Sequence, residues 1–125
     1  MGTMRIFRSP RDIVWGRGSI AHLEKIPGKK ALIVTDGVMT KLGTTARARD
    51  YLLKGGLEVR AFDGVEPEPS IQTIMKIVAE NKNFHPDVIV GIGGGSVIDA
   101  SKAFRIFFEY PHLTFEDVHA LHGPP

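Results

Sequence analysis

The sequence predicts an α/β domain built on a mainly parallel sheet, with helices on both faces of that sheet. Two apolar runs rich in β-branched residues, 30–35 and 88–92, are typical of parallel strands that are buried on both faces. A third run, 57–62, alternates apolar and charged residues, which predicts a strand nearer the sheet edge. Helical signals follow each run, and crossovers of this length favour parallel pairing.

The composition limits what the chain can do. Its 125 residues suffice for one domain with a single core. The formal charge of +2 is spread along the sequence and no Lys/Arg run alternates with aromatics, so we expect no nucleic-acid partner. The lack of cysteine excludes disulfides and thiolate metal sites. Without a long apolar run or a signal segment, we expect a cytoplasmic protein with no membrane partner.

The first part of the chain predicts short elements. Two short strands are expected at 6–7 and 12–15. Ser19 is the predicted N-cap of a short helix that reaches about Ile26, where a Pro-Gly pair ends it. These elements precede the first strongly apolar strand.

The middle of the chain predicts two helical regions separated by a loop. Residues 38–54 are expected to be helical, with a break near Gly43 and a stop at Gly55. Residues 63–70 contain two prolines, which predicts a loop. Ser70 then caps an amphipathic helix with an apolar stripe made of Ile71, Ile74, Met75 and Val78, broadened by Ile77.

The last part of the chain predicts a turn at 110–111 and a short helix over 114–121. His119 and His122 have helical spacing, but two histidines without a third ligand are interpreted as surface residues, so no metal site is predicted. No element is completed at the final residues. We therefore expect residues 1–125 to be one domain of a longer protein.

A triple glycine after the run 88–92 is typical of an anion-binding turn. Gly93, Gly94 and Gly95 end the strand, and apolar residues recur at helical spacing from Ser96 on. Glycines let a phosphate approach the backbone, and the start of a helix offers free N–H groups and a positive dipole end. Neither the dinucleotide fingerprint nor the P-loop pattern is complete here. A structural turn, with Ser96 as N-cap and Asp99 completing a capping box, is an equal alternative.

The carboxyl ends of the predicted strands bring further polar residues to the same sheet edge. Ligands collect there in parallel sheets, so residues 36–37, 66–68 and 93–96 are expected to converge. The Asp36 carboxylate could accept hydrogen bonds from ribose hydroxyls and would repel a 2′-phosphate, which favours NAD over NADP. Alternatively, Asp36 simply caps the next helix. The acid precedes the glycines, which reverses the order of the usual dinucleotide-binding half.

Three segments carry a family resemblance that covers essentially the whole chain: GGGSVIDASKA, TDGVMTKLG and VEPEPS. They resemble the iron-containing (group III) alcohol dehydrogenases. The resemblance implies a Rossmann-like domain, similar to the amino-terminal domain of dehydroquinate synthase, that binds NAD, with NADP less favoured. It implies that Gly94, Gly95 and Ser96 bind the pyrophosphate, and Gly93 is included among the cofactor-binding residues.

The resemblance also assigns roles outside the glycine turn. Asp36 would bind the adenosine ribose, and Asp99 would lie near the nicotinamide. Lys102, one turn later, would face the cleft or form an ion pair with Asp99, and the ion pair is favoured. Glu68 stands where many relatives have an asparagine, and a carboxylate cannot donate that asparagine's hydrogen bond.

Finally, the resemblance implies functions that this chain does not carry. A second, helical domain of the family binds a divalent metal, iron or zinc, so no catalytic or metal-binding residue is expected here. The full enzyme would oxidise or reduce a small alcohol or aldehyde as a homodimer or larger assembly. Two alternatives stay open: a stand-alone nucleotide-binding module without catalysis, and part of a polyol or sugar-phosphate dehydrogenase of the same superfamily.

Overall fold

The computed structural model describes residues 16–113, so the strands expected at 6–7 and 12–15 and the helix at 114–121 lie outside the described residues. The first helix, η1, is a 3₁₀-helix. The elements occur in the order η1 (Ser19–Lys25), β1 (Lys30–Thr35), α1 (Gly37–Lys41), α2 (Thr44–Lys54), β2 (Glu58–Phe62), α3 (Ile71–Glu80), β3 (Val88–Ile92) and α4 (Gly95–Glu109).

The sheet is parallel, as predicted, and its three described strands have the order β2-β1-β3. Leu32 on β1 lies opposite Arg60 of β2 on one side and Ile89 of β3 on the other. The chain therefore adds β2 on one side of β1 and returns to add β3 on the other side. This change of direction makes a topological switch point, where open α/β sheets form a crevice at the carboxyl ends of their strands.

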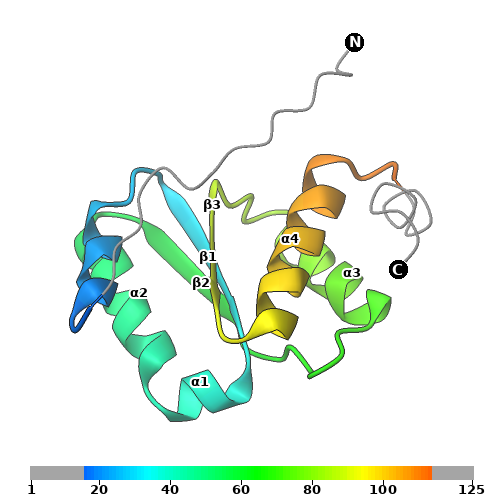
Figure 1. The fold of residues 1–125 in the computed structure, drawn as a ribbon. Coiled ribbons are helices and arrows are strands. Elements are labelled where there is room, and N and C mark those ends of the chain that lie inside the picture. Colours follow the sequence, from blue (N-terminus) through cyan, green and yellow to red (C-terminus); the bar gives the residue numbers. More distant parts are fainter. Residues whose placement is uncertain (1–15, 114–125) are drawn as a thin grey trace.

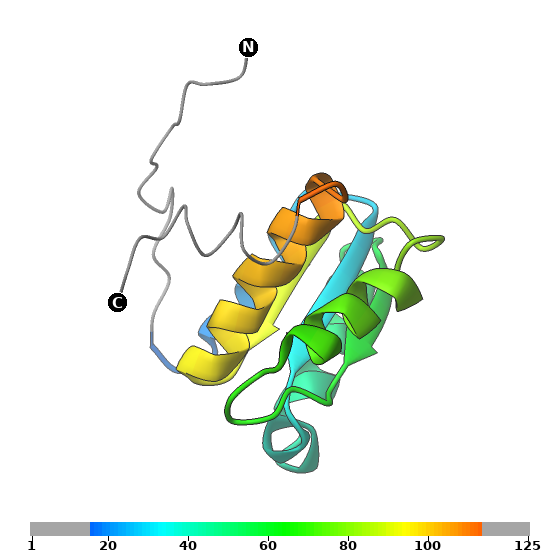
Figure 2. The ribbon, with the colours of Figure 1, turned by 90° about the vertical axis from the view of Figure 1, so that its right-hand side faces the viewer.

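Helices cover both faces of the sheet, which confirms the prediction (Figure 1). The Leu32 and Val34 side chains pack in the core cluster that includes residues of α3 and α4, and Figure 2 shows these two helices lying across that face. Ala31 and Ile33 point the other way, into a cluster with α2 and η1. The alternation follows from the strand geometry, because successive side chains point to opposite faces.

The two apolar strands differ in burial. On β1, every residue from Ala31 to Thr35 is buried. All five residues of β3 are only partly buried, so the prediction that 88–92 is buried on both faces is wrong for the described part of the chain. The reason is topological: β1 is the one strand that pairs with β3 there. The edge position expected for 57–62 is confirmed within residues 16–113, since β2 pairs only with β1.

The glycines mark helix ends more accurately than the serine does. The break at Gly43 and the stop at Gly55 are confirmed as the N-cap and C-cap of α2. Ser19 is not an N-cap, because Gly18, in the left-handed conformation (φ 77°), takes that position and no side chain caps η1. A residue with φ above zero favours glycine, so the backbone selects Gly18 over its neighbour.

The helix α3 begins as predicted but buries a slightly different stripe. Ser70 is its N-cap, and the Ser70 side chain accepts a hydrogen bond from the Thr73 amide. Ile74 and Ile77 are its buried residues, whereas Met75 is 43% exposed. Ile71 and Val78 are partly buried against the same cluster, so Met75 is the one member of the predicted stripe that lies outside it.

Candidate functional site

A cleft with a volume of about 490 Å³ lies where the carboxyl ends of β1 and β3 meet the loop 63–70. We call it the strand-tip cleft. The prediction that Asp36 and the glycine turn share one sheet edge is confirmed. The cleft is lined by Asp36, Gly37, Val38, Lys41, Val65, Glu66, Pro67, Gly94, Gly95, Ser96 and Val97.

Hydrogen bonds around Thr35 hold the walls of the cleft together. The buried Thr35 hydroxyl donates to the carbonyl of Ile92 at 2.6 Å, which ties the end of β1 to the end of β3. The Val65 amide donates to the Thr35 carbonyl at 3.3 Å and so attaches the loop to the same point. The three walls are therefore positioned by one residue at the end of the central strand.

Asp36 combines the two roles that the sequence left open. It is the N-cap of α1, and its Oδ1 accepts a hydrogen bond from the Met39 amide at 2.9 Å. Its Oδ2 lies toward the glycine turn, 3.5 Å from where a Cβ on Gly93 would stand. The capping interpretation is confirmed, and it leaves Oδ2, beside the glycine turn, without a hydrogen bond in the described part of the chain.

The three glycines of the turn differ in what a side chain at each position would contact. Gly93 has φ +147°, and a Cβ there would lie 2.7 Å from Cγ2 of Val97, so this position requires glycine for folding. At Gly94 and Gly95 a Cβ would meet no atom within 4 Å, so the backbone of both faces open space. A ligand can therefore approach the chain closely at the second and third glycines.

The start of α4 is left open for an acceptor. Its N-cap is Gly94 and no side chain caps it. The first amides to bond within the helix are those of Val97 and Ile98, which donate to the Gly94 carbonyl at 3.1 Å. No hydrogen bond within residues 16–113 uses the amides of Gly95 and Ser96. Free amides at the positive end of a helix dipole are a favourable environment for an anion.

Ser96 has a different role from the predicted one. The helix begins one residue earlier than expected, at Gly95, so Ser96 lies in its first turn and the capping box with Asp99 does not form. The Ser96 hydroxyl instead donates to the carbonyl of Pro67. This bond fastens the loop 63–70 to α4 across the cleft.

The acid of the proline loop that faces the cleft is not the predicted one. Glu66 lines the cleft and Glu68 does not. The Glu66 Oε1 accepts hydrogen bonds from the Thr73 hydroxyl at 2.5 Å and from the Ser70 amide at 3.2 Å, and these two bonds lower the pKa of Glu66. The sequence signal was available, since an acid four residues before the N-cap Ser70 can reach back to the helix start.

Two predicted site residues lie away from the cleft. Asp99 and Lys102 are exposed on α4 and do not line it. The ion pair favoured between them is wrong, because the side-chain pairs found in the described structure are Lys76–Glu80 and Arg105–Glu109. Exposed pairs of this spacing contribute little, so solvation competes with them easily. Lys102 borders a separate groove beside the start of β3, with Asp87 and Arg105.

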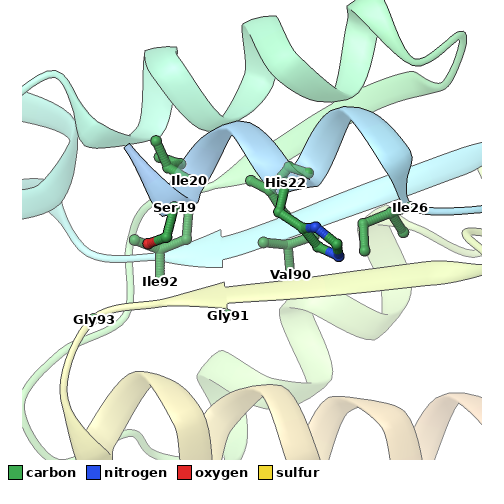
Figure 3. Close-up of a pocket in the computed structure, with 9 residues that line it drawn as sticks. Ser19, Ile20, His22, Ile26, Val90, Gly91, Ile92 and Gly93 are labelled. Carbon is green, nitrogen blue, oxygen red and sulfur yellow. The ribbon is translucent and has the colours of Figure 1, made fainter. Parts of the chain in front are cut away.

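Another groove, of about 620 Å³, runs along β3 beneath η1 (Figure 3). Ile20, His22 and Ile26 line it from η1 and its end, and Val90 and Ile92 line it from the strand. It follows the side of a strand, and its lining includes neither the start of an α-helix nor a carboxylate. The strand-tip cleft, which has both, is therefore the better candidate for a functional site.

Metal-binding and membrane-spanning features are both absent from residues 16–113. No group of three or more His, Cys, Asp or Glu residues is arranged to hold a metal ion in this part of the chain. None of the described helices has the length and apolar character needed to cross a bilayer.

The fold and the cleft define an open parallel α/β domain that presents a free helix start and a carboxylate at a topological switch point. The family model described as iron-containing alcohol dehydrogenase matches residues 10–124. The chain belongs to the iron-containing alcohol dehydrogenase family, which confirms the resemblance seen in the sequence.

Individual relatives agree with this family. The chain is 44% identical to the NADPH-dependent butanol dehydrogenase of Clostridium saccharobutylicum over 116 residues, which are 92% of this chain and 30% of that protein. The iron-containing alcohol dehydrogenase of Thermococcus thioreducens superposes with a TM-score of 0.81 at 35% identity, over 88% of this chain and 30% of that one. The NADH-dependent butanol dehydrogenase A of Thermotoga maritima gives a TM-score of 0.71 at 31% identity, over 81% and 27%. The chain thus spans about a third of the length of these relatives.

Proposed function

We propose that residues 1–125 are the dinucleotide-binding domain of an alcohol dehydrogenase that interconverts small alcohols and aldehydes. The observation that carries this proposal is the uncapped start of α4 beside the Asp36 carboxylate at the switch point of the sheet. The names of the family and its relatives support the reaction class. Because the chain spans about a third of those relatives, the activity is proposed for the whole protein.

The residues of the cleft fit a dinucleotide. The open backbone of Gly94 and Gly95 and the free amides of Gly95 and Ser96 suit a pyrophosphate, which needs donors and close approach. The remaining oxygen of Asp36 suits a ribose hydroxyl. Gly93 holds the turn that places these groups, so its role is to shape the site.

The choice between the two nicotinamide cofactors is a separate part of the proposal. The relatives' names include both NADPH-dependent and NADH-dependent enzymes. In this chain the Asp36 carboxylate lines the cleft, and it would repel the phosphate that distinguishes NADP from NAD. We therefore propose NAD as the preferred cofactor.

The reaction needs groups that lie outside the described residues. A bound nicotinamide would exchange hydride with the carbinol carbon, and a bound divalent metal, iron or zinc, would polarise the alcohol oxygen. Residues 16–113 provide no cluster suited to that metal, so we assign metal binding and substrate contacts to other parts of the protein. Assembly as a homodimer or larger and a cytoplasmic location complete the proposal, and gel filtration and imaging of the tagged protein test them.

Titration with NADH tests the proposal directly. NADH fluorescence should rise when it binds, with a dissociation constant up to the millimolar range because one domain forms only part of the binding surface. The full-length protein should reduce NAD in the presence of a primary alcohol and a divalent metal. Absence of both heat and fluorescence change at millimolar NADH would overturn the proposal. Binding without turnover of any alcohol by the full-length protein would favour the stand-alone nucleotide-binding module.

A further inference from the structure

Lys41 lies in the strand-tip cleft, beside the groups proposed to bind the dinucleotide. It is the last residue of α1, the short helix that Asp36 begins. Among the described residues that line the cleft it is the one cation, beside the carboxylates of Asp36 and Glu66. Its ammonium forms no ion pair within the described part of the chain. A cation without an internal partner beside two acids is available to a ligand.

Asp36 is poorly suited to exclude a 2′-phosphate alone. Its Oδ1 accepts the Met39 amide, and the positive end of α1 offsets part of its negative charge. Only Oδ2 has no hydrogen-bond partner within the described residues, so a ribose diol that contacts both oxygens would share Oδ1 with the Met39 amide. The Asp36 carboxylate therefore repels the 2′-phosphate of NADP less strongly than a carboxylate with no hydrogen bond and no helix start beside it would.

We propose that Lys41 is a second specificity residue that binds the 2′-phosphate of NADP(H), so that this protein uses both nicotinamide cofactors. The inference rests on the proposed function, because it assumes that the adenosine ribose lies beside Asp36. Asp36 and Lys41 then act in opposite directions on the same phosphate, and their balance sets the ratio of NADPH to NADH use. The flexible stem of lysine lets the ammonium reach a phosphate without a fixed geometry.

Two small nucleotides separate this contact from the rest of the site. AMP and adenosine 2′,5′-bisphosphate share the adenine, the ribose and the 5′-phosphate, and they differ only in the group that Lys41 is proposed to bind. In calorimetric titrations, Lys41→Ala should weaken the bisphosphate about fivefold, the upper range for one exposed ion pair, and leave AMP unchanged. In the wild type, added salt should weaken the bisphosphate more than AMP, and Lys41→Ala should remove that difference.

A matched control is available on α3. Lys76 is exposed and lies outside the cleft, so Lys76→Ala removes the same charge and should leave both affinities unchanged. In the full-length enzyme, Lys41→Ala should lower the ratio of kcat/KM for NADPH to that for NADH about fivefold. The same shift in Lys76→Ala would show that only net charge matters, and would overturn the inference.

The outcomes also separate this inference from the proposed function. Equal weakening of AMP and the bisphosphate in Lys41→Ala would place Lys41 at the shared 5′-phosphate, which overturns the inference and leaves the proposed function intact. Unchanged affinity for both would overturn the inference alone. If NADH, AMP and the bisphosphate all fail to bind the wild type, the proposed function fails and the inference fails with it.

Discussion

The helices α3 and α4 lie side by side on one face of the sheet, yet their first turns are built differently (Figure 2). The start of α3 is closed: the Ser70 hydroxyl accepts the Thr73 amide at 3.1 Å, and Glu66 accepts the Ser70 amide. The start of α4 has Gly94 as its N-cap and no capping side chain. One helix start has a capping side chain, and its neighbour has none.

This difference separates a structural helix start from a candidate binding site. Glycine at an N-cap costs only about a few tenths of a kcal/mol relative to a capping side chain, so the start of α4 stays uncapped at little loss of stability. The uncapped start lies at the switch point of the sheet, where ligands of α/β proteins bind. The capped start lies on the loop that borders the same cleft and supports it.

The largest expected effect is at the open helix start. Gly94→Val places a branched side chain in the open space that the pyrophosphate would occupy. Losing about two charge-assisted hydrogen bonds should weaken NADH on the order of 100-fold. The fold should persist, because Gly94 has φ −84° and ψ −163°, an extended conformation that valine adopts readily. Isothermal titration measures the affinity and circular dichroism the fold; unfolding in place of lost binding would favour a purely structural turn.

The next largest effect is on stability, one residue earlier. Gly93→Ala forces a side chain into a region of φ that is almost exclusive to glycine and into contact with Val97. The free energy of unfolding should fall by about 1–3 kcal/mol. Gly94→Ala is the matched control and should lower it by roughly 0.5–1 kcal/mol, because alanine is a poorer N-cap than glycine but meets no strain or contact there. Urea unfolding measures both, and equal losses would contradict the separate roles assigned to the two glycines.

A smaller effect is expected at the closed helix start. Ser70→Ala removes the cap of α3 and should lower the free energy of unfolding by about 1 kcal/mol. NADH affinity should stay within about twofold, since the Ser70 side chain does not line the cleft. Ser70→Asp, which retains a capping acceptor, should restore the stability. A large loss of NADH affinity in Ser70→Ala would show that both helix starts take part in binding.

The smallest effect is a pH dependence confined to the closed start. Folding lowers the pKa of Glu66 from its ordinary value of 4.5, chiefly through the Thr73 hydroxyl and then the Ser70 amide. The ionised carboxylate therefore stabilises the fold fully above that value, and this stabilisation is lost as the pH falls through the lowered pKa. Glu66→Gln should be less stable than the wild type at neutral pH, and the difference should shrink in acid. Urea unfolding at several pH values tests this; a difference that does not change with pH would exclude Glu66 as its source.

Much of the fold follows from local sequence patterns. The runs 30–35 and 88–92 predicted β1 and β3 with their observed bounds, because apolar runs rich in β-branched residues favour the strand conformation. Prolines and glycines predicted the loop 63–70 and the limits of α2. The convergence of Asp36 with the glycine turn also followed, since parallel strands bring their carboxyl ends to one edge.

The errors concern side chains whose role depends on partners distant in sequence. Ser96 appeared to be an N-cap, but Gly94 starts the helix and the Ser96 hydroxyl bonds across the cleft to Pro67. The sequence predicted Glu68 as the site residue, but Glu66 lines the cleft. The direction of each side chain in this proline loop depends on the helix that follows it, since Glu66 bonds to the Ser70 amide. Lys41 was overlooked for the same reason.

The sequence by itself determined the parallel α/β class, the order of the elements and the family to which the chain belongs. These depend on periodicity and on short glycine and acidic motifs, which are local properties. Only the tertiary structure decided which helix start has no capping side chain and which acid borders the cleft. It also decided that Lys41 is the one lysine among the described residues that line the cleft. Those outcomes depend on contacts between residues far apart in the chain, and such contacts exist only once β1 and β3 pair and α3 and α4 pack against them.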